Sequence, residues 1–194
     1  MTYSILYIDD KNIDKIKSSE IFIRVMKDFM ECFELSNNIV DEINSEAYII
    51  KNTKSNSKVK FRYFIVLQEN IPIASARLEF VSMYKMCEIH NVCVPKKYRR
   101  QGYCNILMDL IHYFIFHKKK YNLLHVYCDS KNKPACKCYT KSFGDSIVVN
   151  KKIKIPYISK ISVKSFYTCK SKHMTKLQII REKYDKIKIC KKLK

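Results

Sequence analysis

Glycine is scarce in this chain, which has only two glycines, Gly102 and Gly144, in 194 residues. Gly102 follows the basic turn "PKKYRR" at 95–100 and precedes an apolar run that reaches residue 116. The residues before the turn, 84–94, have the apolar content of a buried strand. The order is therefore strand, basic turn and helix, with a glycine where the helix begins.

This arrangement is typical of an anion site. The first amides of a helix lack internal partners and face outward, and the helix dipole adds partial positive charge at the same end. A glycine leaves room for a bulky anion, and Arg99 and Arg100 would add charge-assisted hydrogen bonds. A plain helix start with an exposed basic turn is the alternative.

Hydrophobic periodicity predicts a mixed order of elements along the rest of the chain. The predicted strands are 2–8, 61–68, 72–80, 84–94, 123–129, 146–155 and 161–169, and the predicted helices are 19–35, 38–50, 102–118 and 132–143. This order indicates an α/β fold with one mixed sheet. We expect a single domain over 1–169 and a basic tail with some helical character over 170–194.

The formal net charge of +20 indicates a negatively charged partner, although a lysine-rich composition throughout the chain explains it equally well. The tail at 170–194 would bind nucleic acid or an acidic partner, or form a solvated helix. The N-terminus lacks the pattern of a signal peptide, and no apolar run is long enough to insert into a membrane. We expect a cytoplasmic protein, with a nuclear location left open.

Nine cysteines in a chain without an export signal are expected to be reduced thiols. Cys136 and Cys138, with Cys128 and His125 nearby in sequence, could be drawn as a zinc site. No second close pair of ligands completes it, so no metal is expected.

Two segments carry a family resemblance. "RRQGYC" at 99–104 resembles the pyrophosphate-binding signature of the GNAT superfamily of N-acetyltransferases, with Cys104 where Gly or Ala is usual. "NKPACKCYTKSFG" at 132–144 resembles the second signature of that family, with Gly144 five residues after Tyr139, where four is usual. The resemblance is close over about residues 60–145, and it implies a GNAT-like fold.

The resemblance also implies a function, which is transfer of the acetyl group of acetyl-CoA to a primary amine. The strand before the basic turn would part from its neighbour and pair with the pantetheine arm, and the turn would hold the pyrophosphate. Asn132 would face the pantetheine or its thioester end. The implied cofactor-binding residues on the strand and turn are Val92, Cys93, Val94, Arg99, Arg100, Gln101, Gly102, Tyr103, Cys104 and Asn105.

The reaction needs an acid for the leaving thiolate and a base for the acceptor ammonium. Tyr139 matches the general-acid position of the family, although a plain core tyrosine is the alternative. Glu88 and His90 lie two apart on one predicted strand and so share a face, which makes both candidates for the base. Glu79 is a weaker third candidate, and a covalent route through Cys93 or Cys104 has no partner base in its favour.

The acceptor is left open by the sequence. An acidic group (Glu34, Asp41, Glu42 and Glu46) would favour a cationic amine, whereas the basic segment at 150–160 would favour an acidic acceptor. A protein of another class also fits: a GNAT-like module that binds CoA without turnover and associates with nucleic acid or protein.

Overall fold

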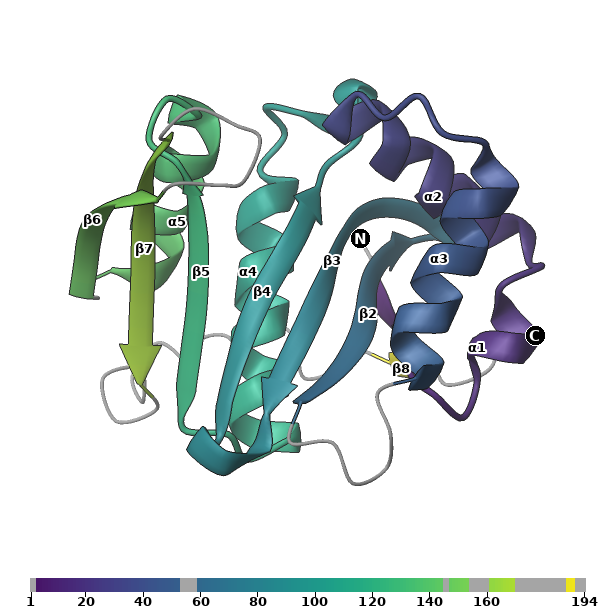
Figure 1. The fold of residues 1–194 in the computed structure, drawn as a ribbon, viewed down its shortest axis with the longest axis horizontal. Helices are drawn as coiled ribbons and strands as arrows, with labels where there is room; N and C mark the ends of the chain where they lie inside the picture. Colours follow the sequence, from purple (N-terminus) through teal and green to yellow (C-terminus); the bar gives the residue numbers. More distant parts are fainter. Residues whose placement is uncertain (1–2, 53–58, 145–146, 154–160, 170–187, 191–194) are drawn as a thin grey trace.

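The computed structural model describes residues 3–52, 59–144, 147–153, 161–169 and 188–190. Their strands form one twisted sheet in the order β6-β7-β5-β4-β3-β2-β1-β8 (Figure 1). The strands are β1 (Tyr3–Ile8), β2 (Val59–Gln68), β3 (Ile71–Val81), β4 (Met86–Cys93), β5 (Leu123–Asp129), β6 (Ile147–Ile153), β7 (Ile161–Cys169) and β8 (Lys188–Cys190). The helices are α1 (Ile13–Ile16), α2 (Glu20–Phe33), α3 (Ile39–Asn52), α4 (Tyr103–Tyr113) and α5 (Lys133–Phe143), with short 3₁₀ turns at Ser82–Tyr84 and Lys96–Tyr98 and a π-helical turn at Phe114–Lys118.

The sheet is mixed. β4 pairs with β5 in parallel and β1 with β8 in parallel, whereas the other described pairs are antiparallel. β2 and β3 form the predicted hairpin, whose turn residues Glu69 and Asn70 both have positive φ. The parallel β4–β5 pair requires a crossover, and α4 supplies it.

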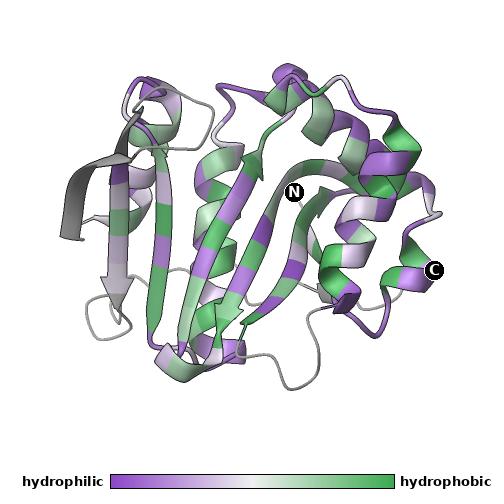
Figure 2. Ribbon diagram, in the orientation of Figure 1, coloured by the Kyte–Doolittle hydropathy of each residue, from purple (hydrophilic) through white to green (hydrophobic). Residues whose placement is uncertain are grey.

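Helices cover the two faces of the sheet unequally. α4 and α5 lie behind it, and α1, α2 and α3 lie in front of β1, β2 and β3 (Figure 1). Alternate residues of β4 therefore meet different surroundings: Cys87 and Ile89 are buried in the core beneath α4, while Glu88 and His90 face the other way. Purple and green alternate along β4 in Figure 2. In front of β5, β7 and the first part of β4, none of the described helices covers the sheet, whereas the end of β4 meets α2.

Three described helix starts have polar caps that follow from local sequence, and one of them is Asn38 before α3, whose Oδ1 accepts a hydrogen bond from the Val40 amide at 2.8 Å. Ser19 caps α2 by accepting a hydrogen bond from the Phe22 amide at 3.3 Å. Asn132 caps α5 by accepting one from the Ala135 amide at 3.2 Å, and Pro134 lies in the first turn, where its missing N–H costs nothing.

The expectation that all nine cysteines are reduced is wrong for four of them. Cys32 on α2 is bonded to Cys93 at the end of β4, and Cys104 on α4 is bonded to Cys138 on α5. These partners are 61 and 34 residues apart in sequence, so only the packing of the elements brings them together. Cys87, Cys128 and Cys136 are free and buried.

The remaining differences from prediction are small. The short helix α1 was not predicted, and the predicted helix 102–118 continues after Tyr113 as the π-helical turn. Part of the predicted tail, Lys188–Cys190, is a strand beside β1 rather than a helix. The rest of the tail, 170–187 and 191–194, lies outside the described residues, as does most of the predicted acceptor segment at 150–160.

Candidate active site

β4 and β5 separate in the middle of the sheet. They pair only from Met86↔Leu123 to Ile89↔Val126, after which β4 stays with β3 and β5 continues along β7. Asn91 has φ +50°, and the β3–β4 register shifts beside it, so a bulge turns the last residues of β4 away from β5. The backbone of Val92, Cys93 and Val94 therefore lies at a gap in the ladder, as a strand that pairs with an extended ligand requires.

The turn after β4 leads into α4. Gly102 precedes the helix with φ +85°, and Arg100 also has positive φ, at +65°. A Cβ added at Gly102 would meet no protein atom within 4 Å. The left-handed backbone, not crowding by the protein itself, is thus what requires glycine here, and the space beside it is open to a ligand.

Hydrogen bonds fix the side chains of this turn and of the first turn of α4. The Tyr103 hydroxyl donates to Gln68 Oε1 at 2.9 Å, and Gln101 Nε2 donates to the Lys97 carbonyl at 3.0 Å. Asn105 Oδ1 accepts from Ser142 Oγ on α5 at 3.4 Å. Its own amide bonds the Gly102 carbonyl, so it closes the first helical turn rather than facing outward. The outward-facing amides are consequently those before Asn105.

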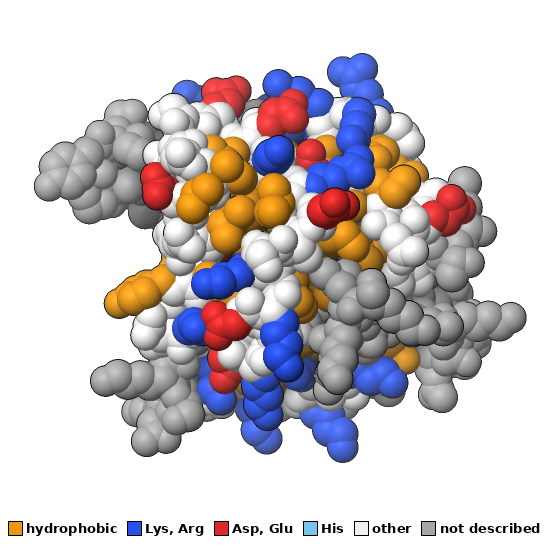
Figure 3. All heavy atoms as spheres, turned by 90° about the vertical axis from the view of Figure 1, so that its right-hand side faces the viewer, with side chains coloured by type: hydrophobic (Ala, Val, Ile, Leu, Met, Phe, Trp, Pro, Cys, Tyr) orange, Lys and Arg blue, Asp and Glu red, His pale blue; other side chains and the backbone are white. Residues whose placement is uncertain are grey.

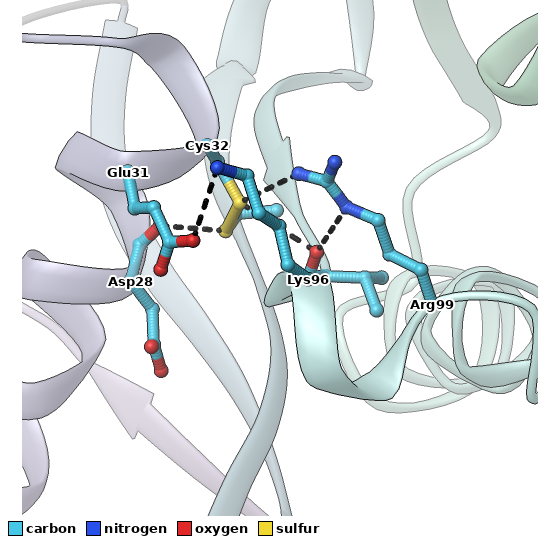
Figure 4. Close-up of a disulfide and its surroundings, with 7 residues drawn as sticks. Asp28, Glu31, Cys32, Lys96 and Arg99 are labelled. Atoms are coloured by element: carbon cyan, nitrogen blue, oxygen red, sulfur yellow. Dashed lines mark hydrogen bonds and ion pairs between the residues drawn. A yellow bond between two sulfur atoms is a disulfide. The ribbon is translucent and has the colours of Figure 1, made fainter.

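Arg99 points away from that turn, toward α2. Its Nε donates to the Val94 carbonyl at 3.0 Å, and its Nη2 lies 3.7 Å from Cys32 Sγ. Figure 4 shows Lys96 and Arg99 reaching toward the end of α2, where Lys96 pairs with Glu31 at 3.4 Å beside the disulfide. A role for Arg99 as a pyrophosphate ligand would require its guanidinium to leave this position.

Both predicted cofactor cysteines are in disulfides. Cys93, 1% exposed, fastens the end of β4 to α2, and Cys104 fastens the first turn of α4 to α5. Neither has a free thiol, which removes the covalent acetyl-cysteine route in this state.

Asn132 caps the start of α5, and Tyr139 lies within this helix. The Asn132 Oδ1 atom is engaged in the helix cap, which leaves its amide NH₂ as the donor toward a ligand. Tyr139 is 4% exposed and packs edge-on against Phe166 of β7, with ring centroids 5.8 Å apart. Burial, with the nearby Cys128 and Cys136 thiols, raises the pKa of the Tyr139 phenol, so it remains protonated at neutral pH.

Glu79, Glu88 and His90 come together on the open face of the sheet, immediately before β4 and β5 separate. His90 Nε2 lies 2.9 Å from Glu79 Oε2 and 3.4 Å from Glu88 Oε1, and neither oxygen is in line for a hydrogen bond. The imidazole nitrogen is shielded from solvent, whereas the two carboxylates are partly exposed. Proximity of Glu88 and His90 was predicted from their spacing; the closeness of Glu79 depends on the β3–β4 register, in which Glu79 and Glu88 are partners.

Sequence reasoning assigned no role in the reaction to His125. Its Nδ1 lies 3.0 Å from Glu88 Oε2 across the parallel β4–β5 pair. Burial by itself would raise the pKa of the Glu88 carboxyl, but the hydrogen bond from His125 and the charges of His125 and His90 outweigh it and hold the pKa below its usual range. Glu88 is therefore ionised at neutral pH.

Glu46 does not belong to an exposed acidic group. It is 3% exposed, and its Oε1 pairs with Arg77 Nη1 of β3 at 2.9 Å. Glu34 and Asp41 are exposed, and Glu42 is half-buried. Arg77 is the register partner of His90, so the Glu46–Arg77 ion pair lies beside the cluster of Glu79, Glu88 and His90, on the side nearer α3. The face of Figure 3 carries Lys and Arg side chains beside acidic and hydrophobic ones.

The described residues contain no group of three or more His, Cys, Asp or Glu side chains placed to hold a metal ion. None of their helices has the length and apolar character needed to cross a membrane.

Comparisons with known proteins give the family of this chain. The model of the acetyltransferase (GNAT) family matches residues 22–145. No curated protein matches the chain.

Solved structures of low sequence identity share the fold. A chimera of the spermidine N-acetyltransferase of Vibrio cholerae and hSSAT is 11% identical, with a TM-score of 0.67 over 90% of this chain and 99% of the other. The Vibrio cholerae spermidine N-acetyltransferase in complex with CoA and spermine is 15% identical, with a TM-score of 0.62 over 89% and 98%. The predicted fold is confirmed. The chain belongs to the GNAT family of acetyltransferases, and it is an N-acetyltransferase whose acetyl donor is acetyl-CoA.

Proposed function

We propose that this chain acetylates a primary amine of a polycationic small molecule, by direct attack of the amine on the thioester, from the open face of β4 and β5. The observation that carries this proposal is the position of Glu79, Glu88 and His90 immediately before the two strands separate. Acetyl-CoA supplies an activated acetyl group there. The residues around it must bind the donor, hold the acceptor and move two protons.

The donor would lie along the end of β4 with its pyrophosphate at the turn into α4. The gap in the β4–β5 ladder and the open space beside Gly102 support this arrangement. Amides from Arg100 to Cys104 would bind the phosphate oxygens, and Asn132 would donate its NH₂ toward the pantetheine arm. Arg99 would exchange the Val94 carbonyl for a phosphate, because an anion is the stronger acceptor.

The acceptor ammonium would be held by the carboxylates of Glu79 and Glu88. Both are partly exposed, and the Tyr127 ring beside them is 44% exposed, so a cation would meet two negative charges and an aromatic ring. The ring centroids of Tyr127 and His90 are 5.8 Å apart, so Tyr127 lies beside the same imidazole that the carboxylates of Glu79 and Glu88 approach. The polyamine acetyltransferases with the same fold support this class of acceptor.

The amine must lose a proton before it attacks. An imidazole has an ordinary pKa nearer to neutral pH than a carboxylate does, and it is therefore the better base. The Glu88 carboxyl, whose pKa is lowered, is a poor final proton holder. We therefore assign His90 Nε2 as the final acceptor of the proton. Because Nε2 is shielded from solvent, the proton would reach it through the carboxylate of Glu79 or Glu88.

The thiolate that leaves when the C–S bond breaks takes a proton from Tyr139. The raised pKa keeps this phenol protonated until the leaving group forms. The phenol is 4% exposed, so its access to the sulfur depends on the space that the parted strands provide.

Mass spectrometry of the products tests the proposal. The protein is incubated with acetyl-CoA and, separately, spermidine, an aminosugar, an aminoglycoside and a lysine peptide. Acetylation is expected for the polyamine above the others, and His90→Gln should lower kcat while leaving binding of acetyl-CoA intact. Absence of an acetylated product with every amine, despite bound acetyl-CoA, would instead indicate the non-catalytic CoA-binding module.

A further inference from the structure

His125 is held on two sides by neighbouring strands. Its Nδ1 lies 3.0 Å from Glu88 Oε2 of β4. Its ring stacks on Tyr167 of β7 with centroids 4.1 Å apart and planes 6° from parallel. His125 is also the register partner of both residues, so one imidazole links three adjacent strands at this point.

The carboxylate of Glu88 consequently has two imidazole neighbours, one on each oxygen. Oε2 accepts from His125, and Oε1 lies 3.4 Å from His90 Nε2. Since Nδ1 is the atom that faces the carboxylate, the ring must carry its proton on Nδ1 to donate there. That hydrogen bond fixes the plane of the carboxylate and so determines where Oε1 lies relative to His90.

We propose that His125 is a positioning residue of the acetyl transfer, which acts by holding the Glu88 carboxylate against His90. The inference rests on the proposed role of His90 as proton acceptor. With Glu88 held, its fixed negative charge stabilises the imidazolium that forms when the acceptor loses its proton. With Glu88 released, the carboxylate would turn toward water, and its charge would be screened.

The surroundings of Glu88 are charged on every side, so the test must separate His125 from the others. Glu79 and Arg77 face Glu88 from β3, His90 lies on β4, and Tyr127 lies beside His125 on β5. None of these is changed by substitution of His125 alone.

Two variants distinguish positioning from packing. His125→Phe keeps a flat ring to stack on Tyr167 but removes the donor. His125→Asn removes the ring but keeps an N–H where Nδ1 was, because Asn Nδ2 and His Nδ1 are attached to the same atom of the side chain. A role in packing alone predicts that Phe is tolerated and Asn is not, and positioning predicts the reverse.

Steady-state kinetics give the first readout. His125→Phe should lower kcat about tenfold, the scale of one hydrogen bond to a charged group, with an unchanged KM for acetyl-CoA. His125→Asn should retain kcat to within about threefold, since the donor is kept. Equal kcat in wild type and His125→Phe would overturn the inference.

The second readout does not depend on activity. In protein with ¹³C-labelled glutamate carboxyls, assigned with the Glu88→Gln variant, the Glu88 signal should titrate at higher pH in His125→Phe than in wild type or His125→Asn. An unshifted titration in His125→Phe would overturn the inference even if the enzyme acetylates amines. If no amine is acetylated but the titration shifts, the positioning contact stands and the proposed function fails.

Discussion

Removal of the Cys32–Cys93 disulfide should destabilise the protein by an amount that follows from its place in the chain. The bond closes a loop with a sequence separation of 61 residues. Closing a loop of this size removes entropy from the unfolded chain worth about 4 kcal/mol at 25 °C. The replacement Cys32→Ala with Cys93→Ala also deletes buried sulfur, because Cys93 is 1% exposed, so the bond and the lost packing must be measured separately.

The assay is urea unfolding of wild type and the double variant, each with and without dithiothreitol. Under reducing conditions both proteins lack the bond, and their difference in the free energy of unfolding reports lost packing alone. Under non-reducing conditions the difference should be larger by about 4 kcal/mol. The Cys104–Cys138 bond is present in both proteins without reductant and absent in both with it, so it cancels.

An identical difference in the two conditions would refute the reasoning. Alkylation of the unfolded, unreduced wild-type protein followed by mass spectrometry gives an independent check, because Cys32 and Cys93 should then remain unmodified. If both are alkylated, they are thiols in solution, as the sequence without its structure predicts.

Three further predictions concern the site. Gly102→Ala should raise the KM for acetyl-CoA and destabilise the fold by about 1 kcal/mol, since alanine at positive φ is strained. The control is Gly144→Ala, at φ +57°, which should show the same strain but leave the KM for acetyl-CoA unchanged. Tyr139→Phe should lower kcat by about 10²-fold, the scale of general acid catalysis, without changing the binding of acetyl-CoA measured by calorimetry, and full turnover would exclude it as the acid. Because the folded-state pKa of Glu88 is lowered, its carboxylate contributes stability above its ordinary pKa of 4.5, and this stability is lost as the pH falls through the folded-state pKa. The difference in unfolding free energy between wild type and Glu88→Gln should therefore shrink below pH 4.5. A difference that is constant with pH would contradict the lowered pKa.

Local patterns were sufficient for the elements and the family. Alternation and helical spacing depend on neighbours within one strand or turn, so most strands and helices occur where they were predicted. The positive φ of Gly102 and Gly144 was not predicted, because the sequence indicated only that a glycine at position 102 leaves room for an anion. The two signatures, each contained within 13 residues, were enough to name the GNAT family that the family model also matches.

Contacts between distant segments could not be obtained in this way. The two disulfides depend on where the end of α2 meets β4 and on where α4 meets α5. The approach of Glu79 and His125 to Glu88 depends on strand register, and a shift of one residue would have turned each side chain to the opposite face. The sequence alone determined which elements form and which residues enter the cofactor signatures, because both are properties of short segments. Only the tertiary structure decided which charges face one another at the separation of β4 and β5, because that depends on how strands far apart in the chain align.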